Sequence, residues 1–165
     1  MPCRVQSSVV LHVLSVLWLV AGIVGRDLSW RHAGQAADLS QLKAIASLAS
    51  AFELRAVRPP TFIVLVTGLL AVQLRGYGLF AFARGAGPAW PFTALLIYLS
   101  IIPVIVFVFL PKGRAYHAAL AEAESRNEIT ARLRAAIADP AVRAGRAYEM
   151  LMIAVLVFLM VVKPF

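Results

Sequence analysis

Four long apolar stretches, separated by segments richer in charge, dominate the pattern of this chain. They lie at about residues 7–25, 60–82, 90–110 and 146–163. The hydrocarbon core of a bilayer is about 30 Å thick, and a helix of roughly 20 apolar residues spans it. The pattern therefore predicts one all-α domain over residues 1–165, a polytopic membrane protein with four transmembrane helices in an antiparallel bundle.

Two of these stretches have ends that need interpretation. The first lies between Arg4 and Arg26. It is longer than the apolar core of a cleaved signal peptide and has no small-residue cleavage site after it, so we expect a retained helix. The second follows Pro59-Pro60 and is short before Arg75. We expect it to continue to about residue 82, with the Arg75 side chain reaching toward the lipid headgroups.

The first and third connections, loops 1 and 3, carry helical patterns of their own. Residues 38–57 place apolar side chains at i, i+3 and i+4 spacing, and Asp38 with Gln41 resembles a capping box. This segment is either an amphipathic helix at the membrane interface or a linker helix that leads into the second span. Residues 113–137 are rich in alanine and glutamate and predict a polar helical hairpin. Asp139-Pro140 is a typical helix start for the last span.

Composition agrees with a membrane protein. Apolar residues make up 61% of the chain and charged residues 15%, whereas soluble domains have about 45–50% and about 25%. These values exclude an ordinary soluble domain and intrinsic disorder. In such a chain the net charge of +8 indicates loops that face anionic lipid, and no nucleic-acid partner is expected. Cys3 is the single cysteine, which excludes an intrachain disulfide.

The distribution of charge gives an orientation. Twelve of the 16 basic residues lie in loops 1 and 3, residues 26–59 and 111–146. The positive-inside rule then predicts that loops 1 and 3 are cytoplasmic and that both termini lie outside a bacterial cytoplasmic (inner) membrane. All eight acidic residues are on the same side as these loops, so each side of the membrane carries a net charge of +4.

His12 is the most distinctive polar residue within the spans. It shares one face of the first helix with Ser8, Ser15, Gly22 and Arg26. Polar groups within a membrane are costly and usually face other helices, so we favour a helix–helix contact. The alternatives are a proton relay and a haem- or copper-binding imidazole. Met160, near the end of the last span, is the candidate second ligand, because it falls on the same side of the membrane.

Three further polar residues are expected to have structural roles. Thr93 and Ser100 lie seven residues apart, hence on one face of the third span, and Pro103 should kink that helix. Their hydroxyls either line a small cavity or satisfy nearby backbone groups, and we favour the second. Glu149 enters the last span from loop 3 and should pair with an arginine. The candidates are Arg26, Arg58, Arg114 and Arg146.

Three segments carry a resemblance to a known family: LHVLSVLWLVAGIVGR, PPTFIVLVTGLL and DPAVRAGRAYEMLMIAVLVFLMVVKPF. They resemble bacterial integral membrane proteins of the domain of unknown function 2269 family, over most of the chain. The Lys163-Pro164-Phe165 ending is the most distinctive part. The resemblance implies a four-span inner-membrane protein and implies no activity. A looser similarity connects the chain to copper-resistance D-type proteins and haem-related membrane oxidases, whose spans carry histidines; only His12 could correspond.

The sequence favours a bacterial integral membrane protein without enzymatic activity. Motifs such as the P-loop, G-x-S-x-G and H-E-x-x-H do not occur in it. We expect a structural, regulatory or transport-accessory subunit whose partners are the lipid bilayer, further copies of itself or other membrane subunits. The alternatives are a haem- or copper-handling redox protein that uses His12 and a small oligomeric transporter.

Overall fold

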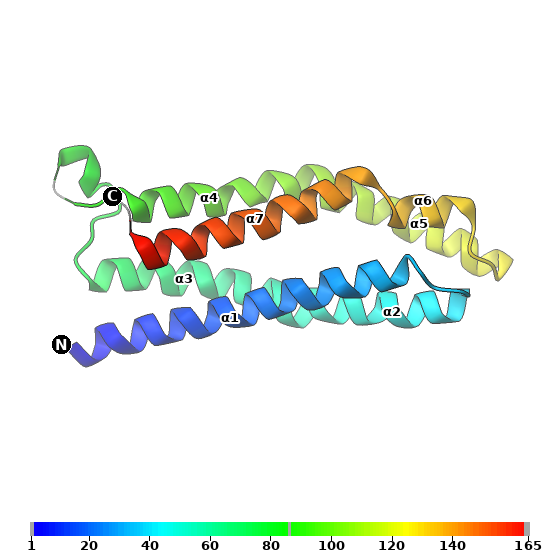
Figure 1. Cartoon of the computed structure of the whole chain (residues 1–165), viewed down its shortest axis with the longest axis horizontal. Helices are drawn as coiled ribbons and strands as arrows, with labels where there is room; N and C mark the ends of the chain where they lie inside the picture. The colour runs from blue at the N-terminus through cyan, green and yellow to red at the C-terminus, as the bar shows by residue number, and fades with distance from the viewer. Residues whose placement is uncertain (1, 86, 164–165) are drawn as a thin grey trace.

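The computed structural model describes residues 2–85 and 87–163, and over these residues the chain is all-α, with no strand. Figure 1 shows two long helical hairpins lying side by side. The first hairpin consists of α1 (Pro2–Ala33), α2 (Leu39–Phe52), the π-helical turn η1 (Glu53–Val57) and α3 (Arg58–Leu74). The second consists of α4 (Trp90–Val104), the π-helical turn η3 (Ile105–Phe109), α5 (Leu110–Arg126), α6 (Ala131–Ile137) and α7 (Pro140–Val162).

Four helices are long and apolar enough to cross a membrane, which confirms the predicted fold class. They are Gln6–Ala33, Leu39–Leu74, Trp90–Arg126 and Ala131–Val162. Even the shortest has 28 residues. At 1.5 Å per residue it is about 42 Å long, more than a 30 Å hydrocarbon core. Each helix can therefore span the bilayer and project from it.

The segments expected in loops 1 and 3 are direct extensions of the spanning helices. Residues 38–57 form α2 and η1, which run without a break into α3, and α5 likewise continues α4 and η3. Prolines flank both π-helical turns: Pro59 and Pro60 follow η1, and Pro103 precedes η3. Proline lacks the N–H that an α-helix needs, and a π-helical turn allows the helix to continue with a changed hydrogen-bond register.

At one end of the molecule, the end of α1 packs with α2, α5 and α6. We call this end the head. Its buried core includes Leu42, Ala119 and Leu133, and Trp30 contacts the Tyr116 ring edge-on with centroids 5.0 Å apart. The two hairpins are thus joined by a packed core at the head (Figure 1).

Local capping interactions explain where α2 and α7 begin. The Asp38 carboxylate accepts a hydrogen bond from the backbone N–H of Gln41 at 2.8 Å, and Asp139 accepts from the N–H of Ala141 at 2.9 Å. The hydroxyl of Ser40 and then the Gln41 N–H hold the pKa of Asp38 below its ordinary value. Both aspartates act as the helix starts that the sequence predicted.

The second span differs from the expectation at its end. The sequence predicted continuation to residue 82, but α3 ends at Leu74. Gly76 has a φ of 75°, a left-handed conformation that glycine adopts without a Cβ penalty and that ends an α-helix. The connection to α4 then contains only the short 3₁₀ turn η2 (Ala81–Arg84).

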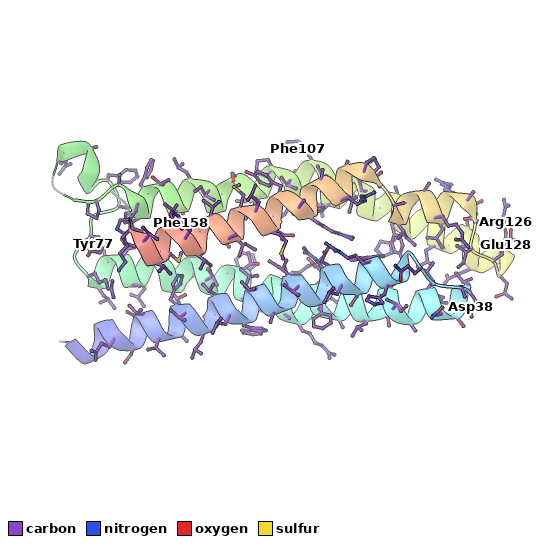
Figure 2. The ribbon with its side chains drawn as sticks, in the orientation of Figure 1. Asp38, Tyr77, Phe107, Arg126, Glu128 and Phe158 are labelled. Carbon is purple, nitrogen blue, oxygen red and sulfur yellow. The ribbon has the colours of Figure 1, made fainter. Side chains whose placement is uncertain are left out.

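The third span buries few of its side chains within the protein. In the most apolar 18-residue window of Trp90–Arg126, only 6% of residues are buried within the protein. Figure 2 shows Phe107 pointing away from the other helices, and its exposed fraction is 77%. Such faces match the hydrocarbon of a lipid bilayer.

Candidate functional site

A cavity of about 1150 Å³ lies between the two hairpins. Residues from the four long helices line it, and most of them are aliphatic or aromatic. Charged residues line both ends of the cavity. Where the spans approach the head they are Arg26, Glu53, Arg58, Lys112, Arg146 and Glu149, and at the opposite end, after α3 and α7, they are Arg75 and Lys163. His12 and Met160 line the cavity farther along the spans.

The centre of the charged part near the head is a triad formed by the buried residues Arg26 and Glu149 and the half-buried Glu53. Arg26 Nη1 donates to Glu53 Oε2 at 3.0 Å, and Arg26 Nη2 donates to Glu149 Oε2. Both Arg26 and Glu149 are almost fully buried, at 7% and 5% exposure. The triad connects α1 to η1 within the first hairpin and to α7 of the second hairpin. Of the four arginines expected for Glu149, the structure selects Arg26.

One further ion pair extends the triad through Glu53, and two others share Asp27 and form a separate group. Arg58 Nε lies 3.3 Å from Glu53 Oε1, and Asp27 binds Arg31 at 2.9 Å. Arg146 Nη1 lies 3.9 Å from Asp27 Oδ1. We call these seven residues the charged cluster, which contains four arginines and three carboxylates: Arg26, Arg31, Arg58, Arg146, Asp27, Glu53 and Glu149. The charged cluster therefore has a net charge of +1.

His12 is held between the helices of the first hairpin. Its Nδ1 lies 3.0 Å from Thr67 Oγ1, and that hydroxyl donates to the Ile63 carbonyl at 2.6 Å. A Cβ at Gly68 would lie only 3.0 Å from His12 Cε1, so this glycine makes room for the ring. His12 thus makes the helix–helix contact favoured from the sequence.

The remaining predicted positions satisfy backbone groups or join helices. Ser15 donates to the Leu11 carbonyl at 2.7 Å, and Thr93 donates to the Ala89 carbonyl at 3.2 Å. Ser100 donates to the Ile97 carbonyl at 2.6 Å and also lies 2.7 Å from the Tyr148 hydroxyl. This last contact joins α4 to α7.

Some interhelical contacts were not anticipated from the sequence. The Tyr98 hydroxyl donates to the Thr61 carbonyl at 2.7 Å, which joins α4 of the second hairpin to α3 of the first. Glu53, Thr67 and Tyr148 also have partners far away in the chain. The sequence marks each as polar within or beside an apolar segment, which is the available signal, but it does not identify the partner.

The described part of the chain brings together no group of three histidine, cysteine, aspartate or glutamate residues able to hold a metal ion. A comparison with protein-family models found no match, and searches of the curated proteins and of the solved structures found none either.

Proposed function

We propose that this multi-pass membrane protein is a non-enzymatic accessory subunit of the bacterial inner membrane, with a structural, regulatory or transport-accessory role. The supporting observation is that polar side chains of the spans connect helices to one another. The Arg26 triad, the His12–Thr67 pair and the Ser100–Tyr148 pair all do so. Interhelical polar contacts of this kind stabilise a bundle in lipid. The resemblance to the domain of unknown function 2269 family supports the bacterial inner membrane as its location.

Native extraction tests the subunit hypothesis. The tagged chain, expressed from its own promoter, is extracted with its surrounding lipid into polymer-bounded nanodiscs and weighed by native mass spectrometry. We expect a complex of fixed stoichiometry, in which the 17.9 kDa chain is bound to further membrane protein. A variant that loosens the hairpins, Glu149→Gln, should lose the complex, and the surface variant Glu124→Gln should keep it. A 17.9 kDa monomer in every preparation would contradict the proposal.

The proposed orientation, with loops 1 and 3 in the cytoplasm and both termini outside, has a separate test. Glu128 lies at the turn between α5 and α6, at the head end of the molecule (Figure 2). In a Cys3→Ser background, Glu128→Cys should resist a membrane-impermeant maleimide in intact cells and react after permeabilisation. Reaction in intact cells at the rate seen after permeabilisation would reverse the orientation.

A further inference from the structure

Two buried hydrogen-bond donors that line the cavity have no acceptor among the described residues. They are Nε of Arg26 and the hydroxyl of Tyr116. Arg26 is 7% exposed and Tyr116 is 9% exposed, so solvent does not readily supply the acceptor. A buried donor without a partner costs about 1–3 kcal/mol. Both donor atoms are fully buried although their residues line the cavity, so a bound acceptor would reach them after a small shift of the side chains beside them and would then satisfy them.

Arg146 places a weakly paired positive charge beside these donors. Its side chain is 17% exposed, and Asp27 is its carboxylate partner at 3.9 Å, while Asp27 also binds Arg31 at 2.9 Å. The Trp30 ring connects the groups in space: Arg146 Cζ lies 5.3 Å from its centroid, and the Tyr116 ring contacts it at 5.0 Å. Among the charged residues that line this part of the cavity, four are basic and two are acidic, so the lining itself carries an excess of positive charge: Arg26, Arg58, Lys112 and Arg146 against Glu53 and Glu149.

The rest of the cavity has a different character. From the charged cluster it continues between the hairpins along apolar side chains such as Leu19, Val64, Leu95 and Ile153. Its volume of about 1150 Å³ is slightly larger than the usual range of small-molecule sites, roughly 300–1,000 Å³. Arg75 and Lys163 line the opposite end of the cavity, so basic residues lie at both ends of the apolar space. The end near the head also has the unpaired donors, so this end fits the acidic head of a molecule whose hydrocarbon tail fills the apolar space.

We propose that the cavity between the hairpins binds an anionic amphiphile, with its acidic head at Arg146, the Tyr116 hydroxyl and Arg26 Nε, and its acyl chain between the two hairpins. This ligand site goes beyond the accessory role proposed above. A free fatty acid and an anionic phospholipid share the required chemistry, a carboxylate or phosphate oxygen next to an acyl chain.

Equilibrium binding to the purified full chain in dodecyl maltoside tests this site. Palmitate and phosphatidylglycerol represent the two sources of the acid, and hexadecanol and phosphatidylcholine are the matched compounds without net negative charge. The key variant is Arg146→Gln. Its control is Arg143→Gln, which removes the same charge one turn earlier on α7 at an exposed position outside the cavity lining. Tyr116→Phe removes the unpaired hydroxyl and keeps the ring against Trp30.

Charge-assisted hydrogen bonds are about twice as strong as neutral ones. We therefore expect the Kd of the anionic compound to rise about tenfold or more in Arg146→Gln and severalfold in Tyr116→Phe, and to change less than about twofold in Arg143→Gln. Binding of palmitate alone would identify a free acid, and binding of phosphatidylglycerol alone would identify a lipid headgroup. Either result supports an anionic amphiphile.

Three results would overturn the proposal: no binding of either anionic compound, equal affinity for hexadecanol and palmitate, or wild-type affinity in both Arg146→Gln and Tyr116→Phe. Tyr116→Phe retains every charge, so a folding defect in Arg146→Gln would still leave a decisive comparison. The assay uses the isolated chain, and its outcome is therefore separate from that of the extraction experiment.

Discussion

Replacement of Glu149 by glutamine tests how strongly the triad holds the two hairpins together. The change preserves the size of the side chain and removes one charge from a pair in which both members are at least nine-tenths buried. Removal of one partner from a buried ion pair costs about 3–5 kcal/mol, because the other charge stays buried alone. Arg26 still has Glu53 at 3.0 Å, so we expect a smaller loss, about 2–3 kcal/mol in the free energy of unfolding.

The assay is an unfolding titration in dodecyl maltoside with increasing mole fractions of dodecyl sulfate, followed by circular dichroism. Glu124→Gln is the matched control, since Glu124 pairs with Lys43 at 2.6 Å on the surface of the head. An exposed pair contributes about 0.2–1 kcal/mol. A loss in Glu149→Gln that is no greater than the loss in Glu124→Gln would refute the reasoning.

A double-mutant cycle separates the pair from its surroundings. Arg26→Gln should destabilise the protein more than Glu149→Gln, because it leaves the buried Glu149 without its partner. Glu53 also loses Arg26 and keeps only Arg58 as an ion-pair partner. The double variant buries no unpaired charge at these positions. We expect it to be more stable than the sum of the single changes predicts, by about 1–3 kcal/mol. Strict additivity would show that Arg26 and Glu149 do not act as a pair.

The same titration tests two contacts within the first hairpin. A Cβ at Gly22 would lie 2.0 Å from the Ala56 carbonyl oxygen, so Gly22→Ala should force α1 away from η1 and cost about 3 kcal/mol in the free energy of unfolding. The control is Gly113→Ala, which has open space around it and should stabilise its helix by about 0.5–1 kcal/mol. Similar effects of the two changes would contradict the close approach of α1 to η1. His12→Ala should cost about 1–2 kcal/mol through the hydrogen bond and the packing that it loses, with a coupling of about 0.6 kcal/mol to Thr67→Val; an unchanged midpoint would show that the His12–Thr67 pair does not hold α1 against α3.

The four spans were predictable from the sequence because the transfer of a side chain into lipid is a local property that sums along a segment. Helix starts at Asp38 and Asp139 were predictable for a similar reason, since a cap acts on residues two or three positions away. The end of α3 at Leu74 was predicted wrongly. The apolar residues after Gly76 suggested a continued span, but the left-handed backbone at this glycine has a stronger local effect.

The candidate site was predictable only in part. Depth in the membrane indicated that Glu149 needs an arginine, but choosing Arg26 requires the register between α1 and α7. That register depends on tertiary packing across residues 123 positions apart. Glu53 was harder to assign, because it lies in a segment whose pattern resembles an amphipathic surface helix. A π-helical turn at Glu53–Val57 also interrupts this segment, and a periodicity of 3.6 residues does not predict such a turn.

The triad lies deep in the predicted spans, where an unpaired charge costs more free energy than a charge at the surface. Lys163 lies 5.9 Å from the Trp90 ring, and lysine with tryptophan is typical of a membrane interface. Glu149 precedes Lys163 by 14 residues of nearly continuous helix, which is about 21 Å. If Lys163 marks one edge of a hydrocarbon core of about 30 Å, a helix along the membrane normal places Glu149 several ångströms inside the other edge. At that depth an unpaired charge is costly, which is why the Glu149 carboxylate needs the guanidinium of Arg26 beside it.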